Sequence, residues 1–133
     1  MLTGSLLAGI AFSWARLGNV HAMSHPVSAF FHVPHGAANA ILLPTIVEYN
    51  APEDHGKYLN IYNYLSETPA VRDTFEPSML VTLLKKLNAR LEIPASLGSV
   101  GVTADDAMKS GNIAVNPRST TKEDILSLYA KAL

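Results

Sequence analysis

Apolar residues recur three and four positions apart through most of this chain, in segments that proline and glycine separate. That spacing places the apolar side chains on one face of an α-helix, because a helix turns once in about 3.6 residues. No stretch of any length alternates apolar and polar residues as a half-buried strand does. The 133 residues therefore predict one all-α, multi-helical domain.

Capping residues and helix breakers set the expected boundaries. Asn19 is expected to cap a helix through the first histidines, which Pro26 should perturb. Thr103 can cap a short helix that starts at Ala104, and Thr120 or Thr121 with Glu123 or Asp124 resembles a capping box. The other expected helices cover residues 2–17, 37–49, 57–65, 79–91 and 122–132.

The first segment, Leu2–Leu17, is apolar on most of its faces. No Lys or Arg precedes it, so it lacks the positively charged start of a signal peptide. Arg16 interrupts it before about 18 apolar residues accumulate, which is too short for a membrane span. We expect a buried helix, and self-association of the chain where this helix stays uncovered.

Charge and composition exclude several classes of function. Ten basic and eleven acidic residues give a net charge of −1 without a basic stripe, so no nucleic-acid or anionic-membrane partner is expected. The chain has no cysteine, which excludes disulfides, thiolate zinc sites and a cysteine nucleophile. This composition agrees with a reducing cytoplasm.

Four of the five histidines lie within fifteen residues: His21, His25, His32 and His35. Imidazole is a common metal ligand and the usual proton shuttle near neutral pH. His21 and His25 share one helix face, but the zinc-protease motif needs Glu where this chain has Ala22. Any one of these histidines can instead be an ordinary core or surface residue, and His32 fits that interpretation best.

A joint metal site for His21 and His35 requires the chain to reverse between them. On one straight helix the two residues would lie roughly 21 Å apart, at about 1.5 Å per residue. Pro34 and Gly36 supply a place to turn. No Asp or Glu occurs between Met1 and Val47, so these residues alone predict an incomplete site.

Four segments of the chain form specific, non-repetitive motifs: A-G-I-A-F-S-W-A-R-L-G-N-V-H-A-M-S-H, P-H-G-A-A-N-A-I-L-L-P, I-P-A-S-L and A-V-N-P-R-S-T-T-K-E-D-I. Together they closely resemble the iron-containing alcohol dehydrogenase family, of the lactaldehyde reductase and propanediol dehydrogenase type. The resemblance covers essentially the whole chain and corresponds to roughly the last third of a typical family member.

The resemblance implies a fold similar to dehydroquinate synthase, with an α/β domain that binds NAD(P) and a helical domain that carries most of the metal site. Fe²⁺, or sometimes Zn²⁺, is held there by one Asp and three His. His21 and His35 correspond to two ligands, and His25 to a histidine beside the nicotinamide. The other ligands and the Gly-rich nucleotide segment have no counterpart here. Residues 1–133 are thus expected to be a partial C-terminal helical domain without the NAD(P)-binding domain.

The implied reaction interconverts an alcohol and an aldehyde. The cation stabilises alkoxide charge during hydride transfer, and His25 positions the nicotinamide or relays a proton. Trp14, Phe31, His32 and Asn39 are expected to line the cleft. Trp14 stands where the family commonly has Asn, and Ser28 where it usually has Gly. The chain by itself is expected to be inactive, because catalysis requires a positioned cofactor.

Two other functions are compatible with the residues. The chain can be a non-catalytic helical protein that binds a partner through Leu2–Leu17. It can also be a small metal-binding protein in which His55 or an acidic residue completes the histidine cluster.

Overall fold

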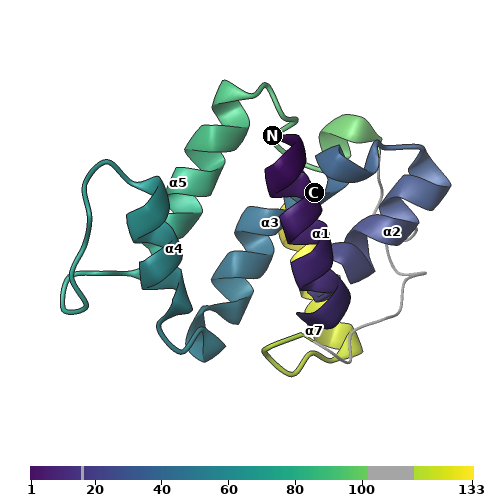
Figure 1. The fold of residues 1–133 in the computed structure, drawn as a ribbon. Helices are drawn as coiled ribbons and strands as arrows, with labels where there is room; N and C mark the ends of the chain where they lie inside the picture. The colour runs from purple at the N-terminus through teal and green to yellow at the C-terminus, as the bar shows by residue number, and fades with distance from the viewer. Residues whose placement is uncertain (16, 102–115) are drawn as a thin grey trace.

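The computed structural model describes residues 1–15, 17–101 and 116–133 (Figure 1). No strand occurs in these ranges, which confirms the predicted all-α fold class. Nor is any helix in them long and apolar enough to cross a membrane. The elements are α1 (Leu2–Ala15), α2 (Asn19–Phe31), α3 (His35–Asn50), η1 (Ala51–Glu53), α4 (Lys57–Leu65), α5 (Pro77–Arg90), η2 (Gly98–Val100) and α7 (Lys122–Ala132).

Helix α3 is the centre of the molecule. It packs against α2, α5 and α7, and α4 in turn packs on α5 (Figure 1). A helix with neighbours on several sides must be apolar on several faces, which is how the α3 sequence reads. Its buried residues are Ala38, Ile41, Leu42, Pro44, Ile46, Val47 and Asn50.

Two apolar cores flank α3. The larger joins α2, α3 and α7, and the Tyr129 hydroxyl within it donates a buried hydrogen bond of 2.7 Å to the Met23 carbonyl. The smaller lies between α3, α4 and α5 and is built on Val47, Tyr62, Leu80 and Val81. The larger core therefore fixes α2, which carries the first histidines, against α3.

Helix α1 is exposed along its whole length, so the prediction of a buried helix is wrong (Figure 1). Leu2 is 89% exposed and Trp14 88% exposed. The helix ends at Ala15, while the predicted end was Leu17, and Arg16 lies outside the described residues. An apolar helix becomes buried only where other elements cover it, and no described element covers α1.

The start of α2 also differs from the prediction. Asn19 is the first helical residue and not the cap; Gly18 precedes the helix with an extended backbone and no capping side chain. The helix then runs through Pro26 without a break. Pro26 is buried, and burial of its ring offsets the one backbone hydrogen bond that proline cannot donate.

Several predicted boundaries are confirmed. The helices at Lys57–Leu65 and Lys122–Ala132 begin and end as expected, and Thr121 and Asp124 form the predicted capping box. Helix α5 begins at Pro77, two residues before the expected start at 79, because proline suits the first turn of a helix. The short helix predicted after Thr103 lies outside the described residues.

The buried Tyr129 hydroxyl provides a test of the larger core. Tyr129→Phe leaves the Met23 carbonyl without this donor, and we expect it to lower the free energy of unfolding by about 1 kcal/mol or more. Urea denaturation followed by circular dichroism measures the change. Tyr64→Phe is the control, because Tyr64 is 91% exposed. Equal stability of Tyr129→Phe and the wild type would contradict this packing.

Candidate metal centre

Helices α2 and α3 bring three of the four clustered histidines together. The ring centroids lie 5.3 Å apart for His21 and His35, 5.1 Å for His25 and His35, and 5.9 Å for His21 and His25. A straight helix would separate His21 and His35 by roughly 21 Å. The reversal that a joint site requires is therefore present in the fold.

Three residues between the helices make this reversal. α2 ends at Phe31, and His32 takes the left-handed backbone conformation with φ 56°. Val33 is buried, and Pro34 leads into α3 at His35, as the sequence predicted for this proline. The turn returns the chain along α2, so His35 lies beside His21 and His25.

The two imidazoles that are expected to bind the metal both have their Nε2 atom close to one side-chain nitrogen, that of Asn39. Asn39 Nδ2 lies 3.1 Å from His35 Nε2 and 3.5 Å from His21 Nε2. Asn39 follows His35 by one helical turn, which places both side chains on the same face of α3. Both Nε2 nitrogens therefore lie within hydrogen-bond distance of the same atom.

The electrostatics around His21 favour its neutral form. Burial lowers the pKa of His21 below the ordinary value for histidine, and the nearby His35 and His25 lower that pKa further. The ion pair among the described residues lies elsewhere, between His55 and Glu53. A neutral imidazole keeps the nitrogen lone pair that a metal ion binds.

The described part of the chain supplies only part of a metal site. Within it, no group of three or more His, Asp or Glu side chains is arranged to hold one ion. His25 stacks on His35 with an interplanar angle of 26°, so it lies next to the converging pair. His21 and His35 form a two-nitrogen half-site, and their donor chemistry fits Fe²⁺ or Zn²⁺.

A mostly apolar open cavity of about 560 Å³ adjoins His21. Phe12 of α1 reaches this cavity, and its ring centroid lies 6.2 Å from that of His21. The cavity thus combines apolar walls with a few amides beside the half-site. Its lining residues are Phe12, Leu17, Gly18, Asn19, Val20, His21, Gly36, Asn39, Ala40, Leu43, Ile46, Asn50, Asn116 and Pro117.

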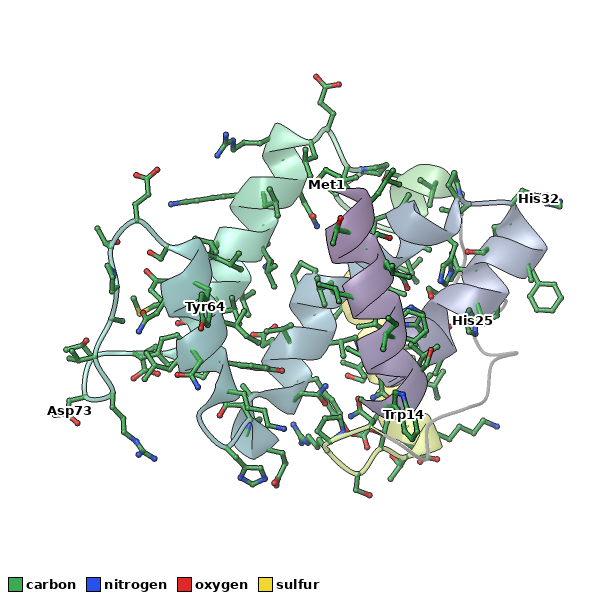
Figure 2. The ribbon with its side chains drawn as sticks, viewed as in Figure 1. Met1, Trp14, His25, His32, Tyr64 and Asp73 are labelled. Atoms are coloured by element: carbon green, nitrogen blue, oxygen red, sulfur yellow. The ribbon has the colours of Figure 1, made fainter. Side chains whose placement is uncertain are left out.

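Of the residues expected to line the cleft, Asn39 lines this cavity and the other three do not. Figure 2 shows His32 at the outer end of α2, away from His25. Trp14 is exposed near the end of α1, and Phe31 packs against the larger core. Nothing in the described structure explains why Ser28 replaces the usual Gly, although its buried hydroxyl has no hydrogen-bond partner.

Asn116 connects the helix ends beside the cavity. Its Oδ1 accepts hydrogen bonds from the Asn19 backbone N–H and from Asn50 Nδ2, both at 3.2 Å. Its Nδ2 donates to Asn50 Oδ1 at 2.6 Å. Arg118 makes a second connection to α3. Its guanidinium donates a hydrogen bond to the Tyr49 carbonyl and lies 4.1 Å from the centroid of the Tyr49 ring. These contacts fix the first turn of α2, and with it His21, to the last turn of α3.

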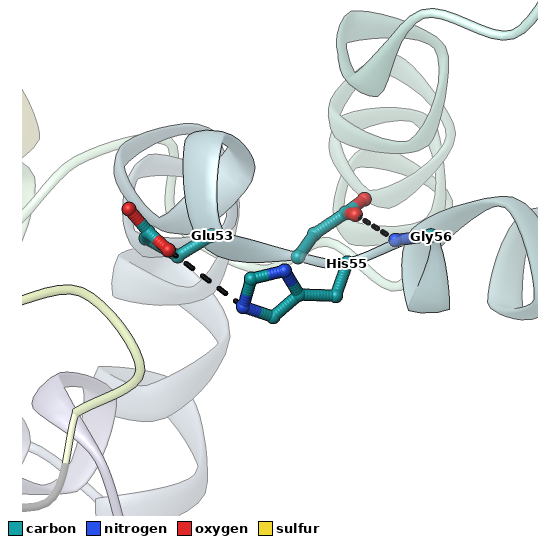
Figure 3. Close-up of polar contacts among 4 residues, drawn as sticks. Glu53, His55 and Gly56 are labelled. Atoms are coloured by element: carbon teal, nitrogen blue, oxygen red, sulfur yellow. Dashed lines mark hydrogen bonds and ion pairs between the residues drawn. The ribbon is translucent and has the colours of Figure 1, made fainter.

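His55 cannot complete the histidine cluster. It lies beyond the end of α3 opposite His35, and the 16 residues of α3 span roughly 24 Å. Figure 3 shows its imidazole paired with Glu53 at 3.7 Å, beside the turn in which Asp54 accepts a hydrogen bond from the Gly56 N–H. The interpretation that used His55 as a further ligand is therefore wrong.

Sequence reasoning did not identify Phe12 or Asn116 as residues of the site. Phe12 belongs to a helix that the sequence predicted as core, so its contact with His21 had no local signal. Pro117 is a local signal for a chain break only, whereas two partners of Asn116, Asn50 and Asn19, are 66 and 97 residues away. Contacts of that range follow from the tertiary fold.

Comparison with known sequences places this chain in a family. The model described as "Fe-containing alcohol dehydrogenase family, C-terminal" matches residues 1–133. This chain belongs to the iron-containing alcohol dehydrogenase family. The earlier resemblance is thereby confirmed.

Relatives of known name agree with this assignment. The 1,3-propanediol dehydrogenase of Citrobacter freundii is 35% identical, and the lactaldehyde reductase of Escherichia coli (strain K12) is 38% identical, each over 99% of this chain. A crystal structure of 1,3-propanediol oxidoreductase superposes with a TM-score of 0.84 at 32% identity, over 97% of this chain. The chain spans 36% to 37% of the length of these relatives.

The lowered pKa of His21 predicts an acid-dependent loss of stability. Above pH 6.5 His21 is neutral in both the folded and the unfolded chain. As the pH falls below 6.5, the unfolded chain binds the proton first, so the free energy of unfolding decreases. We expect His21→Gln to lose less stability than the wild type between pH 7.5 and pH 5.

Urea denaturation across that pH range measures the difference. His32→Asn is the control, because it removes an exposed histidine outside the cluster and suits the left-handed backbone there. Identical pH dependence in His21→Gln and the wild type would show that the cluster does not hold His21 in its neutral form.

Proposed function

We propose that His21 and His35 are two ligands of a catalytic metal ion in an iron-dependent alcohol dehydrogenase, and that residues 1–133 are part of its metal-binding helical domain. The observation that carries the proposal is the convergence of both Nε2 nitrogens on one point. The absence of a paired carboxylate from the described cluster and the lowered pKa of His21 support it, because both favour free lone pairs.

A half-site needs further ligands. Because this chain spans little more than a third of its relatives, we propose that the remaining ligands come from polypeptide outside residues 1–133. The same applies to the residues that hold NAD(P), since no Gly-rich phosphate-binding segment occurs here. Two imidazole nitrogens accept Fe²⁺ and Zn²⁺ alike, and the family assignment favours iron.

The chemistry assigned to the site is the interconversion of a small alcohol and its aldehyde. The bound cation supplies a Lewis acid for the substrate oxygen. His21 and His35 direct their Nε2 atoms to one point, and the Asn116 contacts keep His21 in place. The cavity beside His21 has a mostly apolar wall that includes Phe12.

We propose a separate role for His25 on the exposed side of the pair. Its ring stacks on His35 and meets His21 edge-on, with an interplanar angle of 74°. Stacking restrains the orientation of the His35 ring, which a metal ligand requires. The exposed His25 can then contact the nicotinamide or relay a proton.

The exposed face of α1 supports a second proposal, that this chain associates with itself. Leu6 is 64% exposed and Ile10 is 52% exposed, and the two residues lie on one side of the helix. A continuous apolar surface of this kind is a common site of protein association. This interaction explains α1 without assigning it a catalytic role.

Metal titration tests the first proposal. We expect His21→Ala and His35→Ala each to weaken Co²⁺ binding by about tenfold or more, because each removes a nitrogen donor. The visible absorption of Co²⁺ reports binding and ligand number. His32→Asn is the control and should bind as the wild type does. Unchanged Co²⁺ affinity in both alanine variants would refute the assignment of the two ligands.

Analytical ultracentrifugation tests self-association. The wild-type chain is expected to form dimers or larger species as its concentration rises, and Leu6→Glu/Ile10→Glu is expected to remain monomeric. Ala8→Glu adds a charge on the side of α1 opposite Leu6 and Ile10, so it is the matched control. A wild-type chain that stays monomeric at every concentration would overturn the association proposal.

A further inference from the structure

Helix α2 begins without a capping side chain from the residue that precedes it. Gly18 occupies the capping position and has no side chain that could accept a hydrogen bond from the first turn. The first N–H groups of any helix lack partners within the helix, and Ser, Thr, Asp or Asn at the cap normally supplies one. His21 is the third residue of α2, so it lies in the turn that loosens first when a cap is missing.

Asn116 supplies a cap to α2 from 97 residues away. Its Oδ1 accepts a hydrogen bond of 3.2 Å from the Asn19 N–H, and because that donor is a backbone group, the oxygen end of the amide faces it. Asn116 Nδ2 in turn donates to Asn50 Oδ1 at 2.6 Å and to the Arg118 carbonyl at 2.8 Å. The capping oxygen is therefore held in place by partners at the end of α3 and in the next loop.

This contact explains why residue 18 is glycine. The backbone of Gly18 is extended, with φ −100°, a conformation that any residue adopts. A Cβ on residue 18 would lie 3.1 Å from Asn116 Oδ1. That distance is shorter than an ordinary non-bonded contact of about 3.5 Å. Glycine thus forgoes a local capping side chain and leaves room for the distant one.

We propose that Asn116 is a positioning residue of the metal half-site, which acts through the first turn of α2 to keep the His21 imidazole beside that of His35. The inference rests on the proposed function of these two histidines. It deepens that function by assigning a role to a residue outside the histidine cluster. Asn116 holds the turn that carries His21, and the oxygen that does so has no other helix to cap.

The dependence on Asn116 is confined to the start of α2. His25 lies one turn further along the helix than His21, between Met23 and Val27. Both of these apolar residues are fully buried in the larger core, which holds this part of α2 without help from a cap. Loss of the Asn116 amide should therefore displace His21 and leave His25 where it is.

Nuclear Overhauser spectra of the metal-free 133-residue chain test this difference. In the wild type we expect cross-peaks from the His35 ring protons to those of His21 and His25, whose ring centroids lie 5.3 Å and 5.1 Å away. Asn116→Ala is expected to lose the His21–His35 cross-peak and to keep the His25–His35 cross-peak.

Asn63→Ala is the matched control. It also removes a carboxamide that makes two hydrogen bonds, in this case to the backbone of Ala70 between α4 and α5. The variant therefore lowers stability by a comparable mechanism at a distance from the histidines, and it should keep both cross-peaks.

A double-mutant cycle with Gly18→Ser tests whether Asn116 acts as the cap. Serine at position 18 brings a capping hydroxyl of its own, but its Cβ meets Asn116 Oδ1. In the wild-type chain we therefore expect Gly18→Ser to lower the urea concentration at the unfolding midpoint. In the Asn116→Ala chain, where that space is empty, we expect Gly18→Ser to raise the midpoint and to restore the His21–His35 cross-peak.

The outcomes that contradict the proposal are distinct from those that contradict the proposed function. A His21–His35 cross-peak that persists in folded Asn116→Ala would overturn the positioning role, as would effects of Gly18→Ser with the same sign in both chains. If Asn116→Ala does not fold, Gly18→Ser alone decides, because it crowds the same oxygen. An unchanged ratio of the two cross-peaks in that variant would overturn the proposal.

The spectra are recorded without metal, so they report on Asn116 independently of the Co²⁺ titration. If His21→Ala and His35→Ala leave the Co²⁺ affinity unchanged, the proposed function fails, whatever the cross-peaks show. If both alanine variants weaken Co²⁺ binding but Asn116→Ala keeps the His21–His35 cross-peak, this inference fails and the proposed function stands.

Discussion

The packing of α2 against α3 is the contact on which the candidate site depends. Met23 and Val27 on α2 meet Leu42 and Ile46 on α3 in the larger core. This burial of apolar surface holds His35 beside His21 after the chain reverses. Asn116 then connects the opposite ends of the two helices. The imidazole geometry is thus a product of core packing and of one distant amide.

The chemistry of the site follows from the absence of a carboxylate beside the imidazoles in the described structure. Without a negative partner, burial and mutual repulsion lower the pKa of His21 and favour the neutral ring. Two imidazole rings that face one point are good ligands for a cation but too few for a complete catalytic site. The half-site and the coverage of about a third of its relatives support the same proposal, that this chain shares its active site with other polypeptide.

Helix α1 also depends on contacts that the described structure does not contain, because no described element covers its apolar residues. Its residues are as apolar as those of a core helix, yet every large apolar side chain on it is exposed. Only Phe12 reaches the site, through its contact with the His21 ring. A surface of this kind is stable in water chiefly when another surface covers it. Self-association would supply such cover.

The sequence by itself determined the helical class and the ends of α4 and α7, because periodicity and capping are local signals. The two histidines of the half-site that we propose were assigned by the family resemblance. A joint metal site required the chain to reverse between His21 and His35, but the sequence did not specify how it does so. Tertiary structure alone decided that α1 is exposed, that α2 continues through Pro26, and that His55 lies far from the cluster. It also decided that Asn39 faces both imidazoles. Burial and long-range contacts depend on which segments pack together, and no local pattern encodes that.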